Sequence, residues 1–408
     1  MTDKKIFLLL GGNKLNFGVY EKFKKSGYTV CVVDWNESPQ ITGDKHYRID
    51  VKDSDAIITA LKEDRLWEYV AFAYSSIDLA VPSVACLNKA IGLTTIGPEG
   101  LNRSSSKSLM TRRWNECGLL NRLSKAYVDF DDEIINLNKK MKLIIKPDNS
   151  ASSRGITILN RNSSENDVKF AFNKAFKEAS DNTVVVEEFV EGTEFTVEMI
   201  GDAYGNVCVY GISKKTHTIN TDNNKIAVKL HYNAVSDEFQ NKIAEYGIAC
   251  YKALDFSSSL GHLEILLKED GTLSPVEIGA RSSGFIASDL VDIVSGSGFL
   301  EDTLRVQQGA AVQNGLHPQT DKSSMYFFYD FPAGSIVRNE CCLLDFCDPR
   351  ITSRYFDRSN ITRGRLFSKI DNDNARLGFE ILEGPKALMT PEYIAEREKE
   401  MLMNMLEK

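Results

Sequence analysis

Short apolar runs alternate with amphipathic stretches over the first hundred residues of the chain. The apolar runs cover residues 5–10, 28–34 and 69–74, and the amphipathic stretches between them cover residues 16–26 and 54–64. Runs of this length are typical of buried strands, and stretches with helical periodicity are typical of the helices that cover such strands. The alternation predicts a doubly wound parallel sheet at the start of the chain.

Glycines follow the first predicted strand, as they do in many nucleotide-binding domains. However, Gly11, Gly12 and Gly18 do not have the G-x-G-x-x-G spacing, and Asp34 is a common type of residue at a strand end. The Walker A pattern does not occur in the sequence either. A nicotinamide-dependent oxidoreductase is therefore only a distant alternative.

A second set of strands and helices is predicted between residues 142 and 254. Strands are predicted at residues 142–147 and 156–159, and residues 184–198 are predicted to form a strand, a link and a second strand. The predicted helices cover residues 166–180 and 236–254. The loop from Ser150 to Gly155 is rich in small residues. Such a loop lets backbone N–H groups and hydroxyls approach an anion closely, although a simple β-turn has the same composition.

The stretch from Gly261 to Arg281 reads as two strands joined by a tight turn. Asp270-Gly271 favours a two-residue type I′ turn, because both positions can take the positive φ that this turn needs. The resulting register places Glu264 directly opposite Glu277. Alternation along the strands then gives one apolar face, formed by Leu263, Ile265, Leu267, Val276 and Ile278.

Two carboxylates that face each other across a sheet repel, so a nearby cation is expected. Mg²⁺ prefers oxygen ligands with negative charge, and Glu264 and Glu277 would supply them. Arg281 lies on the same face of the predicted hairpin and adds a fixed positive charge. The alternative is a surface hairpin with solvated glutamates.

Composition narrows the class of protein. The net charge of −8 over 408 residues argues against a surface for nucleic acid or for an anionic membrane. The eight cysteines lack zinc-site spacing and are expected to be reduced thiols, mostly in the core, as in a cytoplasmic protein. No apolar run approaches the roughly 20 residues that a membrane span needs.

Several short motifs occur in a specific order along the chain. A lysine on an early helix, Lys107, comes first, and Lys146 follows in a strand that ends Lys-Pro. Five further motifs follow in order: the small-residue loop, Glu187-Glu188-Phe189-Val190, Glu-Gly-x-Glu ending at Glu194, His262-x-Glu264 and Glu277-x-x-x-Arg281. In this order the chain resembles the ATP-grasp superfamily of carboxylate–amine ligases. The resemblance extends to L-amino acid ligases and to the group of carbamoyl-phosphate synthase and biotin carboxylase.

The resemblance implies a fold and an arrangement of domains. The fold is α/β, with an N-terminal Rossmann-like parallel sheet, a two-lobed ATP-grasp fold of the α+β type and a β-rich C-terminal extension. We expect the Rossmann-like domain at 1–105, the small lobe at 106–190, the large lobe at 191–314 and the extension at 315–408. Beyond residue 315 we expect strands at 325–331, 365–370 and 378–383 and a closing helix at 391–408.

The resemblance also implies a role for each motif. Residues that would bind ATP are Lys107, Lys146, Ser152, Ser153, Gly155, Glu187, Glu188, Phe189, Val190 and Glu194. Glu264 and Glu277 would hold Mg²⁺ or Mn²⁺, and Arg281 would stabilise charge on the reacting acyl group. Lys214 and Lys215 are weaker candidates for the phosphate or substrate region. Gly279 departs from the family pattern, because many members have Asn at that position.

The implied activity is an ATP- and Mg²⁺-dependent ligation of a small-molecule carboxylate to an amine through an acyl phosphate. The alternatives are a carboxylase that activates bicarbonate and a nucleotide-binding sensor without catalysis. The expected partners are the small-molecule substrates, and neither nucleic acid nor a membrane is expected. Both a monomer and a homodimer are compatible with the sequence. The sequence does not identify the carboxylate or the amine.

Overall fold

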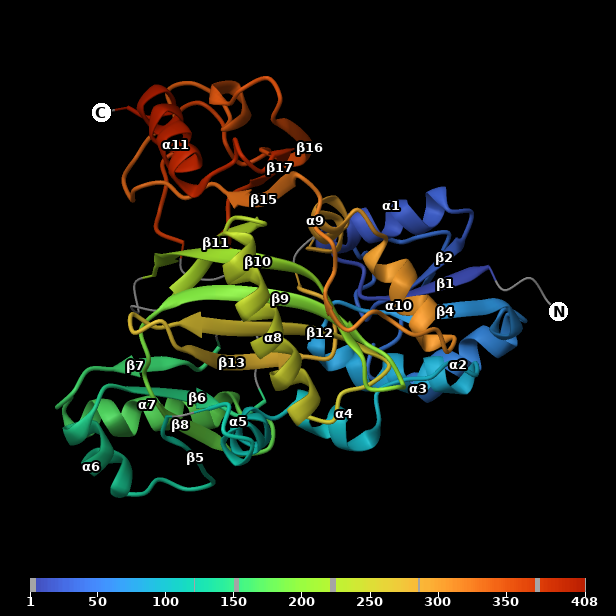
Figure 1. The fold of residues 1–408 in the computed structure, drawn as a ribbon, viewed down its shortest axis with the longest axis horizontal. Coiled ribbons are helices and arrows are strands. Elements are labelled where there is room, and N and C mark those ends of the chain that lie inside the picture. Colours follow the sequence, from blue (N-terminus) through green and yellow to red (C-terminus); the bar gives the residue numbers. More distant parts are fainter. Residues whose placement is uncertain are drawn as a thin grey trace.

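The described residues form three β-sheets that lie side by side with helices around them (Figure 1). The computed structural model describes residues 5–120, 122–149, 154–220, 225–284, 287–370 and 375–407. None of the described helices has the length and hydrophobicity that a membrane span requires.

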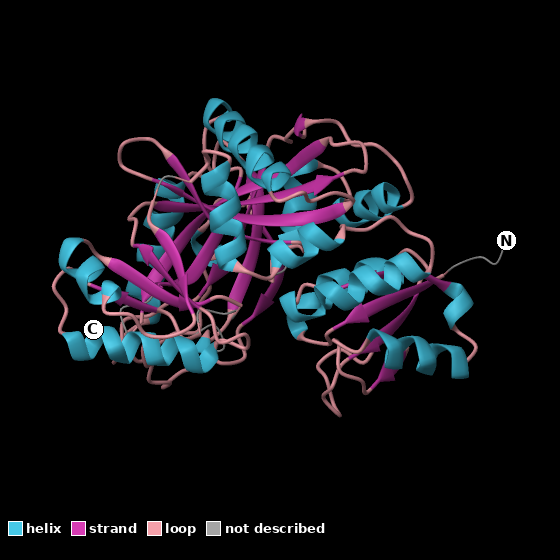
Figure 2. Cartoon of the chain, turned by 90° about the horizontal axis from the view of Figure 1, so that it is seen from below, coloured by secondary structure: helices cyan, strands magenta, loops and turns pink. Residues whose placement is uncertain are grey.

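The N-terminal domain, defined here as β1–β4 with α1–α3, contains the predicted parallel sheet. Its strand order is β3 (Lys45–Tyr47), β2 (Thr29–Val33), β1 (Ile6–Leu10), β4 (Val70–Tyr74), and every pairing is parallel. The helices are α1 (Phe17–Lys25), α2 (Ser54–Glu63) and α3 (Val81–Ala90). They lie on both faces of the sheet (Figure 2), because β1 is buried along its whole length and has to be covered on each side. The predicted architecture is confirmed here.

The second sheet has four antiparallel strands and forms the small lobe. Its order is β5 (Ser124–Tyr127), β8 (Val184–Glu188), β6 (Leu143–Pro147), β7 (Thr157–Leu159). The helices of this region are α4 (Pro98–Ser104), α5 (Lys107–Glu116), α6 (Glu133–Lys140) and α7 (Glu165–Glu178). Helix α7 begins with a capping box formed by Ser164 and Asp167, and it packs against β6.

The largest sheet runs through the centre of the molecule. Its order is β13 (Leu273–Gly279), β12 (Ser259–Leu267), β9 (Thr193–Gly201), β10 (Val207–Ile219), β11 (Lys225–Tyr232), β15 (Lys322–Phe328), β17 (Phe379–Pro385), β16 (Thr352–Asp357), and β14 (Gly315–Leu316) pairs with β10. The associated helices are α8 (Asp237–Ala253), α9 (Ala287–Ser295), α10 (Phe299–Gln307) and α11 (Pro391–Met405). Strand β15 pairs with β11, so the C-terminal segment extends this sheet directly.

The β12–β13 hairpin has the predicted register at the glutamates but a different turn. Glu264 lies opposite Glu277, as predicted. The turn holds three residues, since Lys268 N donates to Thr272 O at 2.9 Å, and only its last residue, Gly271, takes a positive φ, at +79°. The prediction of a two-residue type I′ turn is therefore wrong. A bulge after Glu264 compensates for the longer turn, and it places Pro275 instead of Val276 opposite Ile265 on the apolar face.

One predicted strand is absent from the described C-terminal region. Residues 365–370 do not form a strand, and Leu366 makes only an isolated bridge with Ile336. Phe367 and Ile370 are each 3% exposed. The apolar spacing therefore reflects burial of these side chains in an irregular segment, which cannot be distinguished from a short strand by periodicity alone.

The cysteines are free thiols, as expected, but their burial is mixed. Cys31, Cys208, Cys250 and Cys342 are buried, whereas Cys86 and Cys117 are exposed.

Candidate active site

A cavity of about 650 Å³ lies between the N-terminal domain, helices α4 and α5, and the β12–β13 hairpin. Its lining includes Lys107, His262, Glu277 and Arg281, and the N-terminal domain contributes Asp78. The first four of these residues come from three motifs that the sequence singled out, so the structure brings these motifs together. Charged groups of both signs face the same space, which suits a polar ligand.

Lys107 is held at the first turn of α5 and reaches one of the paired glutamates. The Ser106 side chain caps the helix, and the Asp148 carboxylate accepts from the Ser106 hydroxyl and from Ser108 N, both at 2.6 Å. Lys107 Nζ lies 3.2 Å from Glu277 Oε2. Burial would lower the pKa of Lys107, but the Glu277 carboxylate raises it above its usual value, so the lysine is charged.

A buried cluster with excess positive charge lies in the small lobe. Lys146 Nζ and Arg122 Nη2 lie 2.8 Å and 3.1 Å from the same oxygen, Glu187 Oε2. Burial lowers the pKa of Lys146, and the positive charge of Arg122 adds to this effect. Two cations share one carboxylate, so an anion such as a phosphate would stabilise the charged lysine.

A third cluster joins two predicted ligand residues through a lysine. Lys215 donates to Glu194 and, at 2.7 Å, to Glu264 Oε1. His217 Nε2 lies 3.2 Å from Glu194 Oε2. Burial alone would raise the pKa values of both carboxyl groups, but Lys215 holds them well below their usual range. Lys214, the neighbouring residue, points to the opposite face of β10.

His262 is buried beside the cavity and pairs with a carboxylate on the adjacent strand. Its Nδ1 lies 2.6 Å from Glu198 Oε1, which also accepts from the Tyr232 hydroxyl at 3.2 Å. Burial would lower the pKa of His262, but Glu198 raises it to about 9. The imidazole is therefore charged at neutral pH, and it lies 3.8 Å from Glu264 Oε1.

Arg281 projects from the end of β13 toward the N-terminal domain. Its Nε donates to Asp78 Oδ1 at 2.6 Å, Nη2 donates to Asp78 Oδ2 at 2.7 Å, and Nη1 donates to the Ser282 carbonyl at 2.9 Å. Burial would lower the pKa of Arg281, but Asp78 raises it further above its usual value. These three hydrogen bonds fix the orientation of the guanidinium plane.

The predicted link, Glu187 to Val190, overlaps the end of β8, because Glu187 and Glu188 are strand residues. Glu188 ends β8, and Phe189 and Val190 follow it before β9 starts at Thr193 in the large sheet. Glu188 N and Phe189 N donate to backbone carbonyls of the small lobe, at 3.0 Å and 2.9 Å. Lys142 Nζ lies 4.4 Å from the centre of the Phe189 ring.

The predicted phosphate loop is only partly described. Ser152 and Ser153 lie outside the described residues. Gly155 has a φ of +73°, and a Cβ there would lie within 3.1 Å of Glu178 and Pro147 atoms, so the position requires glycine. Arg154 lines the cavity.

The residues present suit a divalent metal bound together with a nucleotide. Glu264 and Glu277 face each other on adjacent strands, and each lies within ion-pair distance of a lysine. The described residues contain no cluster of three or more histidine, cysteine or acidic residues arranged for a metal. However, Mg²⁺ in nucleotide sites is usually held by one or two carboxylates together with phosphates, so a pair of glutamates is sufficient.

Comparison with known proteins agrees with this arrangement. Residues 139–289 match the ATP-grasp domain. This match includes strands β6 to β13 and therefore both strands of the hairpin. Over 219 residues it is 25% identical to a D-alanine–D-alanine ligase from Cupriavidus taiwanensis, a match that covers 52% of this chain and 65% of that relative's length.

Solved structures with the same fold cover almost the whole chain. An L-amino acid ligase from Bacillus licheniformis superposes with a TM-score of 0.78 at 16% identity, covering 100% of this chain and 99% of its own. A biotin carboxylase–ATP analogue complex from Campylobacter jejuni superposes with a TM-score of 0.68 at 14% identity, covering 99% of this chain and 91% of its own. The fold shared with these structures therefore extends beyond residues 139–289 and includes the N-terminal parallel sheet.

Sequence reasoning missed the partners of the predicted residues. Arg122, Asp78 and His217 contact Glu187, Arg281 and Glu194, respectively. Arg122 and Asp78 stand in stretches without a motif. His217 lies two residues beyond Lys215 on β10, so strand alternation after Lys215 was a usable signal.

Proposed function

We propose that this chain is an ATP- and Mg²⁺-dependent carboxylate–amine ligase. It activates a small-molecule carboxylate as an acyl phosphate and joins the acyl group to an amine, with release of ADP and phosphate. The observation that carries the proposal is the cavity in which Lys107, Glu277 and Arg281 meet, with Glu264 directly across the hairpin from Glu277.

The nucleotide binds between the two lobes in this proposal. Lys107 and Lys146 pair with the phosphates, and the excess positive charge around Glu187 supports that role. The loop with Ser152, Ser153 and Gly155 covers the phosphates. Backbone groups of Glu187, Glu188, Phe189 and Val190 face the adenine edge, and Glu194 binds the ribose hydroxyls.

Glu264 and Glu277 hold the metal in this proposal. When bound, Mg²⁺ neutralises charge on the phosphates and helps to orient them. Lys215 forms an ion pair with Glu264, and Lys107 forms one with Glu277.

The reaction has two steps. A carboxylate oxygen of the substrate attacks the γ-phosphorus of ATP, and the bond from that phosphorus to the β-phosphate oxygen breaks. The amine nitrogen then attacks the acyl carbon, the bond to the phosphate oxygen breaks, and the nitrogen loses a proton. Arg281 stabilises negative charge on the acyl phosphate and on the tetrahedral intermediate, because its guanidinium is fixed before the charge develops.

The size of the cavity bears on the substrate class. A volume of about 650 Å³ accommodates an amino acid or a similar acid, and it exceeds what bicarbonate requires. The fold shared with the L-amino acid ligase makes amino acids the first substrates to test. A bicarbonate-activating carboxylase, as in biotin carboxylase, is the alternative. We also propose a cytoplasmic location.

ADP release tests the proposal. The purified chain is mixed with ATP, Mg²⁺ and pairs of amino acids, both L forms and D-alanine, and ADP is measured by a coupled assay. We expect ADP to appear only with specific pairs, together with a dipeptide seen by mass spectrometry. ADP that depends on bicarbonate would support the carboxylase instead, and tight ATP binding without any substrate-dependent ADP would support a nucleotide sensor.

A further inference from the structure

The N-terminal domain holds Arg281 through a side chain that no motif contains. Asp78 begins a short 3-10 helix, Asp78–Ala80, which follows β4 after three intervening residues. The two bonds from Arg281 to the Asp78 carboxylate use Nε and Nη2, and the Ser282 carbonyl takes one bond from Nη1. A guanidinium has five N–H groups, so one remains on Nη1 and one on Nη2 for a ligand, among the contacts of the described residues.

Gly279 provides an independent sign that this pair fills a defined space. A Cβ at Gly279 would lie 3.1 Å from Asp78 Oδ1 and 3.2 Å from Arg281 Cγ. The backbone of Gly279 is not left-handed, so conformation does not require glycine here. A side chain at 279 would require the Asp78–Arg281 pair to shift by a few tenths of an ångström, which agrees with the glycine found there.

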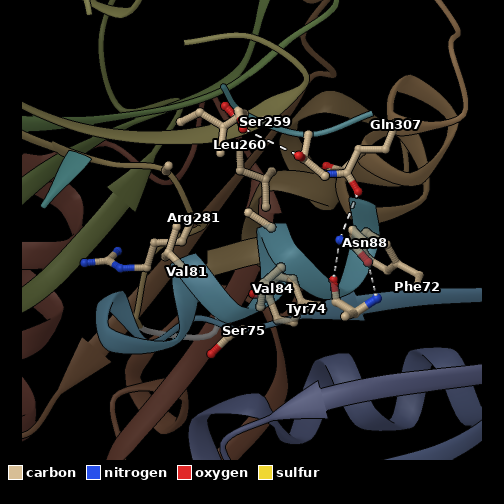
Figure 3. Close-up of a pocket in the computed structure, with 16 residues that line it drawn as sticks. Phe72, Tyr74, Ser75, Val81, Val84, Asn88, Ser259, Leu260, Arg281 and Gln307 are labelled. Carbon is tan, nitrogen blue, oxygen red and sulfur yellow. Dashed lines mark hydrogen bonds between the residues drawn. The ribbon is translucent and has the colours of Figure 1, made fainter. Parts of the chain in front are cut away.

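The residue after Arg281 is also bound to the N-terminal domain. The Tyr74 hydroxyl, at the end of β4, hydrogen-bonds the Ser282 hydroxyl. In a small adjoining cavity, Asn88 Nδ2 donates to Gln307 Oε1 at 3.2 Å, and Figure 3 shows the Arg281 guanidinium pointing away from these two residues. The segment that follows β13 is therefore attached to the N-terminal domain by two successive side chains.

We propose that Asp78 is a positioning residue for Arg281, so that the N-terminal domain completes the active site of the large lobe. The proposal rests on the proposed function for the role of Arg281. Asp78 fixes the plane of the guanidinium and directs its remaining N–H groups into the cavity, and Gly279 leaves room for the pair. Through the Asp78–Arg281 contact, the position of the N-terminal domain determines whether Arg281 is oriented for the reaction.

The first test compares substitutions at Asp78. With a substrate pair found by the ADP assay, Asp78→Asn should lower kcat by about 10- to 100-fold. The reason is that a misplacement of the guanidinium by about 1 Å can cost up to about 100-fold in rate. The KM for ATP should stay within about twofold, since Arg281 acts on the acyl group. Asp78→Glu should recover part of kcat. An unchanged kcat, or a loss that falls mainly on the KM for ATP, would overturn the proposal.

A matched control separates positioning from domain docking. Asp292 of α9 pairs with Lys22 of α1 at 2.6 Å and so also joins the large lobe to the N-terminal domain, away from the cavity. Asp292→Asn should leave kcat within about twofold of the parent value. Equal losses in Asp292→Asn and Asp78→Asn would mean that docking alone explains the effect, and the positioning role would be rejected.

A double-mutant cycle tests the role of Gly279. Gly279→Ala should lower kcat in the parent chain, because the new methyl group displaces the pair. In the Asp78→Ala background the same change should cost little, so the two effects should not add. If the losses of kcat in the two single variants add in the double variant, residue 279 and the Asp78–Arg281 pair do not compete for the same space.

One readout does not depend on catalysis. The ¹⁵Nε–¹Hε signal of Arg281, assigned by its loss in Arg281→Lys, should be sharp and slow to exchange in the parent and should be lost or shifted in Asp78→Asn. If no substrate pair releases ADP but this signal behaves as expected, the proposed function fails and the Asp78–Arg281 pair stands. If ADP is released and the signal is insensitive to Asp78→Asn, the positioning proposal fails alone.

Discussion

At the scale of single residues, Lys146 is a buried group whose charge depends on its neighbours. Burial and Arg122 both lower its pKa, and Glu187 is its single carboxylate partner among the described contacts. A bound phosphate would supply the missing negative charge. Binding of ATP and the charge of Lys146 are therefore coupled.

We expect Lys146→Ala to weaken ATP binding by about 10- to 100-fold, the value of one charge-assisted hydrogen bond. Binding of adenosine should change little, because adenosine lacks phosphates. Isothermal titration with both ligands measures the difference. Lys125→Ala is a suitable control, since Lys125 lies on β5 of the same sheet but pairs with the exposed Glu133 at 2.7 Å. Equal losses for ATP and adenosine would point to misfolding or to a role at the base.

His262 predicts a pH dependence of stability. Its pKa is raised to about 9 in the folded protein, above the usual 6.5, so its contribution is fully present below pH 6.5 and is lost as the pH rises toward 9. The difference in unfolding free energy between the parent and His262→Gln should therefore fall by roughly 1–3 kcal/mol over this range. Urea unfolding at several pH values measures it. A difference that does not change with pH would mean that His262 is neutral.

At the scale of elements, the sequence predicted strand register and helix bounds, because both depend on the local pattern of apolar and polar residues. The register of Glu264 and Glu277 followed from strand alternation, and it held although the turn was longer, because a bulge absorbed the extra residue. The helices at 54–64 and 391–408 were found within a few residues at each end. Contacts between elements distant in sequence, such as Asp78 with Arg281, have no local signal and could not be predicted.

The hairpin itself can be tested through its metal dependence. Glu277→Gln should weaken Mg²⁺-dependent binding of a non-hydrolysable ATP analogue by about 10-fold or more, while binding without Mg²⁺ changes little. The thermal midpoint should stay within a few degrees, because Glu277 is partly exposed. Glu269→Gln, in the turn of the same hairpin, removes the same charge and should have no effect. Parent-like metal dependence of Glu277→Gln would make the glutamate pair purely structural.

At the scale of the whole molecule, the site is assembled from parts that are far apart in the chain. The hairpin contributes Glu264 and Glu277, the segment after β13 contributes Arg281, α5 contributes Lys107, and the N-terminal domain contributes Asp78. These elements are labelled in Figure 1. No single lobe contains the full set. We propose that this assembly transfers the γ-phosphoryl group of ATP to a carboxylate.

Hydroxylamine trapping tests this claim most directly. The enzyme is incubated with its carboxylate substrate, ATP and Mg²⁺, without the amine, and hydroxylamine is added. We predict a hydroxamate of the substrate with ADP as the nucleotide product, and Arg281→Met should reduce its rate of formation far more than it changes the KM for ATP. Formation of AMP and pyrophosphate would show an adenylate mechanism and would contradict the account.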